Sequence, residues 1–384
     1  MQHLPTYSRS GERHDPVPTM NRRNAFILGG GALVIADAAT VGLSKFQMGS
    51  MGDYDASVAK SRAALAKNPA LKDLVRFATL AASGHNTQPW RFRIGEGQVE
   101  ILPDFSRRTA IVDPDDHHLF VSLGCAAENL AVAAGAHGRP GTLRFNPAND
   151  GSVVFEFTTG PSTPSALSDA IPRRQSTRTE YDGRPIPVAD LKSLAEASAV
   201  SGIDLILLTE PRQIEPVRDL VIAGNTAQMA DAAFLRELKT WLRFNPRRAL
   251  ASGDGLFSAA SGSPNLPTWL GPFVFDRVFR VGAENDKYAR QLRSSSGVAV
   301  FVSEKDDRDH WFRAGRACQR FALKAAALGL KVAYVNQPVE VARLRPELAS
   351  LVGLPGRRPD LVIRFGCGPR LPFSPRRPVE TVLV

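Results

Sequence analysis

The chain has few cysteines, and they form no recognisable pair. Only three occur among 384 residues, Cys125, Cys318 and Cys367, and no C-x-x-C motif joins any two of them. Zinc sites and thiol redox centres depend on closely spaced ligands, so neither is expected. Cys125 and Cys318 fall in alanine-rich helical patterns, which favours small buried hydrophobic residues. The adjacent His117 and His118 have no further ligand at a zinc-like spacing, so we expect no metal.

Several other signatures are missing as well. The chain holds no G-x-S-x-G nucleophile motif and no G-x-G-x-x-G dinucleotide frame. Its formal charge is +10, from 48 Lys and Arg against 38 Asp and Glu, but the basic residues do not form one run with interleaved aromatics. Nucleic-acid binding is therefore not expected, and the excess positive charge favours anionic ligands.

The amino-terminal region, residues 1–50, is expected to be a disordered leader with a signal. Residues 1–19 are polar and rich in turn formers. Arg22 and Arg23 precede an apolar run at 26–35, about half the roughly 20 residues that a membrane span needs. This pattern resembles a twin-arginine export signal, which implies the twin-arginine translocase as a partner and a periplasmic or otherwise exported protein. The alternative is a cytoplasmic protein in which this region is only an amino-terminal helix.

Two rounds of helix and strand patterns follow, and they predict an α+β fold in two halves, residues 54–160 and 164–384. A segment rich in aromatics, proline and glycine, residues 224–293, interrupts the second half. Such long excursions are often functional, which favours a lid over surface padding. In the first half, helices are expected at 54–66, 69–81 and 117–137, and strands at 90–94, 98–102, 141–146 and 152–158.

The two halves share a pattern of small residues. Five small residues of the long helix recur 191 positions later, and each copy ends at a glycine that leads into a short β-like segment. Alanine-rich helices also recur by chance, so the pattern gains weight only if the halves carry complementary chemistry. The pairs are Gly124 and Gly315, Ala126 and Ala317, Ala131 and Ala322, Ala134 and Ala325, and Gly138 and Gly329.

The segment 83–92 is unusual for a plain helix or strand. Ser83 and Gly84 end an apolar helical run, and Asn86, Thr87 and Gln88 then place three hydrogen-bonding side chains in a row. Pro89 enforces an extended backbone ahead of an alternating strand that begins at Trp90. Such a triplet is suited to a planar, amide-rich ligand. A polar loop with an anchoring tryptophan is the alternative, and spacing alone does not separate the two.

A second polar cluster opens the second half. Arg173, Arg174 and Arg178 lie within six residues, with Ser176 between the last two. Buried without a counter-anion, three arginines would repel one another. The stretch is therefore either a solvated basic face or a phosphate cradle, since phosphate accepts paired guanidinium contacts.

The first segment resembles the S-x-x-N-x-Q-P-W motif of the FMN-dependent nitroreductase family, in which it touches the flavin ring. The resemblance implies ring contacts for Ser83, Asn86 and Gln88. The second cluster is similar to the family's R-R-S-x-R opening, which grips FMN phosphate and ribityl hydroxyls. Gln175 interrupts that match, so Arg174, Ser176 and Arg178 carry it and Arg173 does not.

The carboxyl end resembles the family's closing R-x-P-L-E-x-V-V, in which one arginine reaches the same phosphate. Arg376 aligns best, and Arg377 is the alternative. Asn336 and Gln337 follow the second copy of the repeat helix, where family members place contacts near the flavin ring. Because the first half keeps only the Q-P-W piece and the second half only the arginines, a single FMN site shared by both halves is implied.

The resemblance implies a nitroreductase-like fold with mixed β-sheets flanked by helices, formed by two tandem repeats as an intramolecular, monomeric pseudo-dimer. It is closest to the mycobacterial Acg-like branch, whose members carry a lid over the flavin. The implied function is FMN-dependent oxidation of NAD(P)H with a nitro, quinone-like or other small electron acceptor. No catalytic side chain is expected, because the flavin carries the electrons. The alternative is an FMN-binding or storage protein whose lid denies access to any acceptor.

Overall fold

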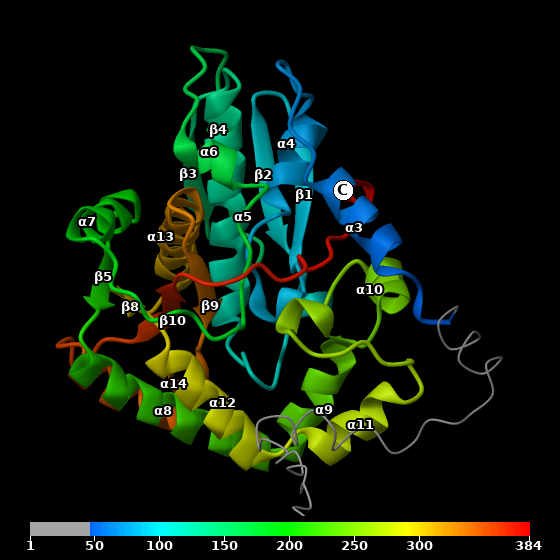
Figure 1. The fold of residues 1–384 in the computed structure, drawn as a ribbon. Helices are drawn as coiled ribbons and strands as arrows, with labels where there is room; N and C mark the ends of the chain where they lie inside the picture. The colour runs from blue at the N-terminus through cyan, green and yellow to red at the C-terminus, as the bar shows by residue number, and fades with distance from the viewer. Residues whose placement is uncertain (1–46) are drawn as a thin grey trace, which may run out of the picture. The chain divides into compact units, whose positions relative to one another are not determined.

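A computed structural model describes residues 47–384. The predicted twin-arginine signal and almost all of the predicted leader lie outside the described residues. Within them, helices alternate along the chain with two four-stranded antiparallel sheets and one two-stranded parallel sheet, formed by β6 (Leu242–Arg243) and β7 (Leu256–Phe257) (Figure 1). The predicted α+β class, with sheets flanked by helices, is confirmed.

The first sheet belongs to the first half of the chain. Its strands are β1 (Trp90–Gly95), β2 (Gln98–Pro103), β3 (Gly141–Asn146) and β4 (Ser152–Phe157), in the order β1-β2-β4-β3. All neighbours pair antiparallel. Buried residues alternate with exposed ones at the start of β1, as its sequence pattern predicts. Each predicted strand therefore lies within about a residue of its observed position.

The second sheet has the same connectivity. Its strands are β5 (Ile203–Leu208), β8 (Gly297–Ser303), β9 (Lys331–Tyr334) and β10 (Pro359–Gly366), in the order β5-β8-β10-β9. All neighbours are antiparallel. One parallel bridge is added at an edge strand of each sheet, Phe92 with Leu383 and Ser176 with Val332, so both sheets are mixed in this limited sense.

Two long helices lie between the sheets, α5 (His117–Ala136) against the first and α13 (Arg308–Ala327) against the second (Figure 1). They cross at Gly124 and Gly315. A Cβ on Gly124 would lie 2.0 Å from the carbonyl oxygen of Phe312, and one on Gly315 would lie 2.0 Å from that of Val121. Only glycine allows so close an approach of two backbones, which explains the small residues in both copies of the pattern.

Polar side chains join the same two helices in a reciprocal manner. Glu128, which is 2% exposed, accepts from Arg320 at 2.7 Å, and Asn129 accepts from Gln319 at 2.7 Å. Each partner on α13 lies 191 positions after a partner on α5. The contacts between α5 and α13 are therefore related by an approximate two-fold axis that exchanges the two helices. Helix α5 is long and apolar enough to cross a membrane by composition alone, but 83% of its apolar window is buried, so it is a core helix of this fold.

The remaining helices surround this core, and two of them begin and end elsewhere than expected. Helix α3, expected at 54–66, begins at Met51 because Ser50 caps it by accepting from the N–H of Asp53, and it ends at Ser61. Helix α4, expected at 69–81, begins at Leu71 and ends at Ala78. The helices are α3 (Met51–Ser61), α4 (Leu71–Ala78), α6 (Ala166–Ala170), α7 (Val188–Ala197), α8 (Pro211–Ala230), α9 (Ala232–Trp241), α10 (Pro246–Ser252), α11 (Gly271–Val278), α12 (Val281–Arg293), α14 (Gln337–Glu340) and α15 (Arg345–Leu351).

The carboxyl-terminal segment returns to the first half of the chain. The N–H of Phe92 donates to Val382 and the N–H of Val384 donates to Phe92, at 2.7 and 2.9 Å, so the end of the chain lies beside β1. Figure 1 shows this segment, in red, running from the second sheet toward α3 and α4. The path carries residues 375–377 past the loop that joins α4 to β1. Segments far apart in sequence therefore meet at that loop.

Candidate functional site

Three arginines from three different segments, two of them buried and one half-buried, gather beside the α4–β1 loop. Arg62 follows α3, Arg174 follows α6, and Arg376 lies in the carboxyl-terminal segment. Arg62 is 8% exposed and Arg174 is 2% exposed. Burial, with a contribution from the charge of Arg174, lowers the pKa of Arg376 to about 9. Burial, then Arg376 and Arg174, holds the pKa of Arg62 well below its usual range. The three charges therefore act on one another at short range.

Backbone carbonyls accept most of the hydrogen bonds from this cluster. Arg62 donates to Pro172 at 2.8 Å, and Arg174 donates to the carbonyl of Leu80 at the same distance. Arg376 donates to Leu80 and to Ala81, at 3.2 and 3.0 Å. Across residues 47–384, no carboxylate forms an ion pair with any of the three guanidinium groups within 4.0 Å. Their positive charge is therefore not balanced by the described part of the protein.

Several nitrogen atoms of the cluster are buried without a hydrogen-bond partner. They are Nε of Arg62, Nε and Nη1 of Arg174, and Nε of Arg376. An unsatisfied buried donor costs about 1–3 kcal/mol, and more when it is charged. A bound phosphate would offer a charge of about −1.5 to −2 and several acceptor oxygens. The cluster therefore fits a phosphate group.

Helix α3 contributes two residues that the sequence analysis missed, Tyr54 and Arg62. The hydroxyl of Tyr54 donates to the carbonyl of Phe373 at 2.6 Å, and the guanidinium carbon of Arg62 lies 3.8 Å from the centre of the Phe373 ring. Burial raises the pKa of Tyr54. Tyr54, Val58 and Arg62 recur every four residues, so one buried helix face ends in a cation. This four-residue spacing is the feature of the sequence that could have indicated Tyr54 and Arg62 as site residues.

A second polar group lies near the first, around Arg178 and His85. Burial, followed by the charges of Arg178 and His118, lowers the pKa of His85 to about 4, so its imidazole is neutral at pH 7. Its Nδ1 is buried without a partner, as is Oε1 of Gln337. The hydroxyl of Tyr334 lies 3.3 Å from Sγ of Cys318, and burial raises the pKa of this phenol. Nδ1 of His85 and Oε1 of Gln337 could therefore each form a hydrogen bond with a bound ligand.

The backbone of the loop is strained at this point. His85, Asn86 and Gln88 adopt φ angles of 44°, 55° and 54°, a left-handed conformation that is uncommon for residues other than glycine. Ser83 supports it by accepting from the N–H of Gln88 at 3.1 Å. Ser122 on α5 accepts from the N–H of Gly84 at 3.4 Å. Strain of this kind persists only where surrounding contacts hold it, and it clusters at functional sites.

The predicted ring-contact side chains Asn86 and Gln88 are already fully engaged. Asn86 donates to the carbonyls of Gly255 and Pro375, each at 3.1 Å, and accepts from Arg376 at 2.9 Å. Gln88 donates to Gly253 at 2.9 Å and accepts from the N–H of Arg377 at 3.0 Å. Both amides therefore clamp the loop to two other segments. A ring contact through either side chain requires one of these bonds to break.

The other predicted site residues divide into two groups. Arg174, Arg178, Gln337 and Arg376 supply unpaired polar atoms or lie in the arginine cluster. Arg377 instead donates to the carbonyl of Gln88 at 3.2 Å, so of the two carboxyl-terminal alternatives Arg376 is the one in the cluster. Arg173 is exposed. Asn336 accepts from the N–H of Val362 at 2.9 Å, and Ser176 forms a bridge with Val332 at the edge of the second sheet.

Part of the predicted lid, residues 224–293, packs on this loop. Its segment 253–255 holds Asn86 and Gln88, and Asp254 pairs with Arg107, which follows β2, and with Arg243 at 2.6 Å. Phe257 lies 4.5 Å from the ring of Tyr54. Other aromatics of the segment face solvent, with Trp269 72% and Phe273 70% exposed.

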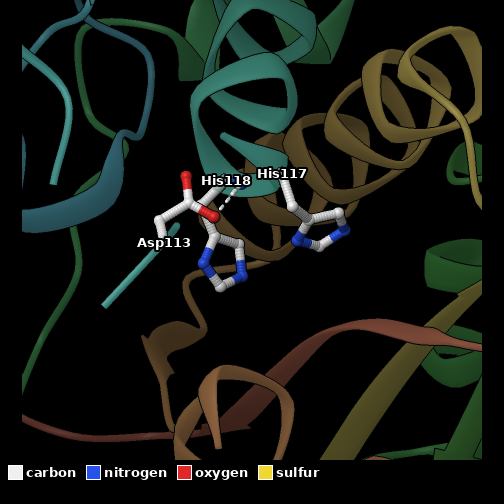
Figure 2. A group of neighbouring side chains, drawn as sticks. All are labelled: Asp113, His117 and His118. Atoms are coloured by element: carbon white, nitrogen blue, oxygen red, sulfur yellow. Dashed lines mark hydrogen bonds between the residues drawn. The ribbon is translucent and has the colours of Figure 1, made fainter. Parts of the chain in front are cut away.

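Asp113, His117 and His118 form a neighbouring group whose ligand atoms all lie within 4.8 Å of one another (Figure 2). Both carboxylate oxygens of Asp113 are engaged, because they accept the N–H groups of His118 and Leu119 at 3.0 Å each. Nε2 of His117 lies 2.9 Å from Oδ1 of Asp360 on β10. These bonds cap α5 and join it to the second sheet. We therefore assign the group a structural role, although its proximity was not foreseen from sequence.

Comparison with known proteins relates the chain to a single group. Residues 171–368, just over half of the chain, match the Nitroreductase family. A Mycobacterium tuberculosis protein named "Putative NAD(P)H nitroreductase Rv3131" is 28% identical over 326 residues, which cover 82% of this chain and 90% of that protein. A second, "Putative NAD(P)H nitroreductase acg" of the same species, is 25% identical over 329 residues, covering 81% and 94%.

Solved structures give a weaker likeness. The FMN-dependent nitroreductase NfnB of Mycobacterium smegmatis, solved in complex with NADPH, aligns with 56% of this chain and 96% of its own, with a TM-score of 0.37 and 10% identity. A Bacteroides fragilis nitroreductase with bound FMN aligns with 54% and 90%, with a TM-score of 0.34 and 16% identity. The match over residues 171–368 is the finding that decides the family. The chain belongs to the nitroreductase family.

Proposed function

We propose that the protein is an FMN-dependent oxidoreductase that passes electrons from NAD(P)H to a nitro, quinone-like or other small acceptor. Family membership and the names of the two mycobacterial relatives support the reaction class and the electron donor. The observation that carries the cofactor assignment is the buried cluster of Arg62, Arg174 and Arg376, with four unpartnered nitrogen atoms and no carboxylate partner among residues 47–384. A flavin phosphate supplies the missing charge and acceptors.

The second polar group is suited to the flavin ring. When bound, the isoalloxazine carries the electrons, and the protein's task is to hold and tune it. Arg178 brings a cation whose guanidinium makes no hydrogen bond within the described residues, and we assign it to negative charge at the pyrimidine end of the ring. Neutral His85 and the Gln337 carbonyl oxygen offer uncharged polar contacts.

We further propose that the chain is a fused, monomeric pseudo-dimer with one FMN site. The identical strand order of the two sheets and the reciprocal contacts of α5 with α13 support two related halves. The site draws Arg62 and the loop at 80–88 from the first half and Arg174, Arg178 and Arg376 from the second. Neither half holds all of these residues, so one flavin per chain is expected.

A second candidate function is FMN storage without turnover. It is favoured by the hydrogen bonds of Asn86 and Gln88 to residues 253–255, because they fix a covering segment directly on the loop. A nicotinamide and an acceptor must each reach the flavin in turn. A segment that never opens would exclude both.

Single-turnover reduction separates the two functions. The purified flavoprotein is mixed with excess NADH or NADPH without oxygen, and the flavin absorbance is followed. We expect the flavin to bleach fully with at least one donor and to regain its colour when a quinone is added. Photochemical reduction of the same sample is the control that shows the flavin to be reducible. A flavin that light reduces and neither nucleotide reduces would establish the storage function instead.

A further inference from the structure

A cavity of about 890 Å³ lies beside the first half of α13. It is bounded by β3 and the turn after it, by the first half of α13 and by the loop between α7 and β5. Its volume falls within the range of about 300–1,000 Å³ that is typical of small-molecule sites. The apolar part of its wall consists of Leu143, Phe145, Val200, Trp311 and Phe312.

The cavity lies next to α13 at the position that corresponds to the position of the proposed flavin site next to α5. On α5, Ser122 accepts from the N–H of Gly84 and so faces the strained loop. Counted 191 positions on, Ser122 corresponds to Arg313, which lines the cavity. Val200 lies in the loop that precedes β5, as the strained loop precedes β1. The cavity is thus the counterpart of the flavin site, built from different residues.

The charged part of the wall is mainly positive. Four arginines line the cavity against two aspartates, Asp307 and Asp309. Arg313 pairs with Asp309 at 2.6 Å, Arg144 pairs with Glu156 at 3.3 Å, and Arg316 shares Glu128 with Arg320, so each of these three cavity arginines has a carboxylate partner.

Arg308 differs from the other cavity arginines. It donates only to the carbonyl of Asp150, at 2.9 Å, and its guanidinium carbon lies 4.8 Å from the centre of the Phe120 ring. In the region 47–384 no carboxylate pairs with it within 4.0 Å. It is also the first residue of α13, where the aligned peptide dipoles add positive potential.

We propose that this cavity binds a small aromatic carboxylate. Arg308 takes the carboxylate in a paired guanidinium contact, and the ring packs against the aromatic wall. The cavity does not suit a flavin phosphate, because it lacks the cluster of buried, unpaired arginines found at the counterpart site. The inference does not depend on the redox function, since it concerns different residues.

The test titrates 2-naphthoate into the full-length, FMN-loaded protein by calorimetry. We expect one saturable site per chain, at least tenfold weaker binding in Arg308→Gln, and weak binding of the uncharged 2-naphthalenemethanol. Val200→Trp, which places an indole at the rim, should also weaken binding by tenfold or more. Arg212→Gln, an exposed arginine on α8, is the matched control and should bind as the wild type does.

Three results would overturn the proposal. The first is the absence of saturable binding in the wild type. The second is equal affinity in the wild type, Arg308→Gln and Val200→Trp. The third is release of FMN as 2-naphthoate binds, which would place the ligand at the flavin site instead.

Discussion

Single residues explain why the centre of this protein must hold an anion. Arg62, Arg174 and Arg376 are drawn from positions 112 and more residues apart, and each makes hydrogen bonds mainly to main-chain carbonyls. Carbonyl oxygens satisfy donors without neutralising charge. Two buried cations and a half-buried third without a counterion would destabilise the fold, since removing water from a charge costs several kcal/mol. Flavin binding is therefore expected to stabilise the folded protein as well as to equip it for electron transfer.

A buried acid and base near α5 give a prediction about pH. Burial raises the pKa of Asp360 to about 7 and holds the pKa of His117 well below its usual 6.5. Between about pH 4 and 6.5 the folded protein holds a proton on Asp360, whereas the unfolded chain holds one on His117. Their contributions to the pH dependence of unfolding therefore oppose each other in the wild type.

Substituting either residue should reveal the pH dependence that the other contributes to the free energy of unfolding. In His117→Gln the folded state binds more protons than the unfolded state, so the free energy of unfolding should fall as pH rises from about 4 to 7. In Asp360→Asn the unfolded state binds more protons than the folded state, so the free energy of unfolding should fall as the pH drops below 6.5. Each slope is at most about 1.4 kcal/mol per pH unit. Urea denaturation at several pH values measures both, and parallel curves for the two variants would contradict the assignment.

At the scale of elements, we propose that part of the segment 224–293 controls access to the proposed flavin. The segment at 253–255 is tied to the α4–β1 loop by Asn86 and Gln88 and to the end of β2 by the pair of Asp254 with Arg107. All of these contacts must break if the segment moves away from the loop. Lid opening is a common rate-limiting step in enzymes of this kind of architecture.

Arg107→Gln should therefore speed reduction of the flavin by NAD(P)H and leave the flavin bound. It removes one tether, while Arg243 continues to pair with Asp254 at 2.6 Å. Stopped-flow absorbance gives the rate. Arg108→Gln is the control, because the neighbouring arginine pairs with Asp116 and not with the segment. If both variants reduce at the wild-type rate, these contacts do not gate the site.

Local sequence patterns were sufficient for most elements and insufficient for the site. The helix expected at 117–137 and the strands expected at 90–94 and 98–102 appear almost as expected, because apolar periodicity is a local property. The position of Arg62 beside Arg174 depends on how α3 packs, which no local pattern states. No local pattern predicts the contact of Asn86 either, because its partner Gly255 lies 169 residues away. The side chain that was expected to face the flavin donates to the carbonyl of that glycine instead.

At the scale of the whole molecule, the proposed amino-terminal signal leads to a prediction about where in the cell the protein lies. We propose export through the twin-arginine translocase, on the strength of Arg22 and Arg23 ahead of a short apolar run. The double substitution Arg22→Lys, Arg23→Lys should trap the protein in the cytoplasm, as cell fractionation would show. The pair Arg9→Lys, Arg13→Lys is the control. Retention of the wild type in the cytoplasm would leave this region as an amino-terminal helix only.

The most direct test of the central claim compares FMN with riboflavin, which lacks only the phosphate. Titrated into flavin-free protein, FMN should bind at least 100-fold more tightly, since a charge-assisted hydrogen bond contributes about 1.5–3 kcal/mol. Arg174→Ala should weaken FMN by more than tenfold and leave riboflavin unchanged, while the exposed neighbour Arg173→Ala should change neither. Equal affinities for the two flavins in the wild type, or equal losses for both in Arg174→Ala, would contradict a phosphate site built from the buried arginines.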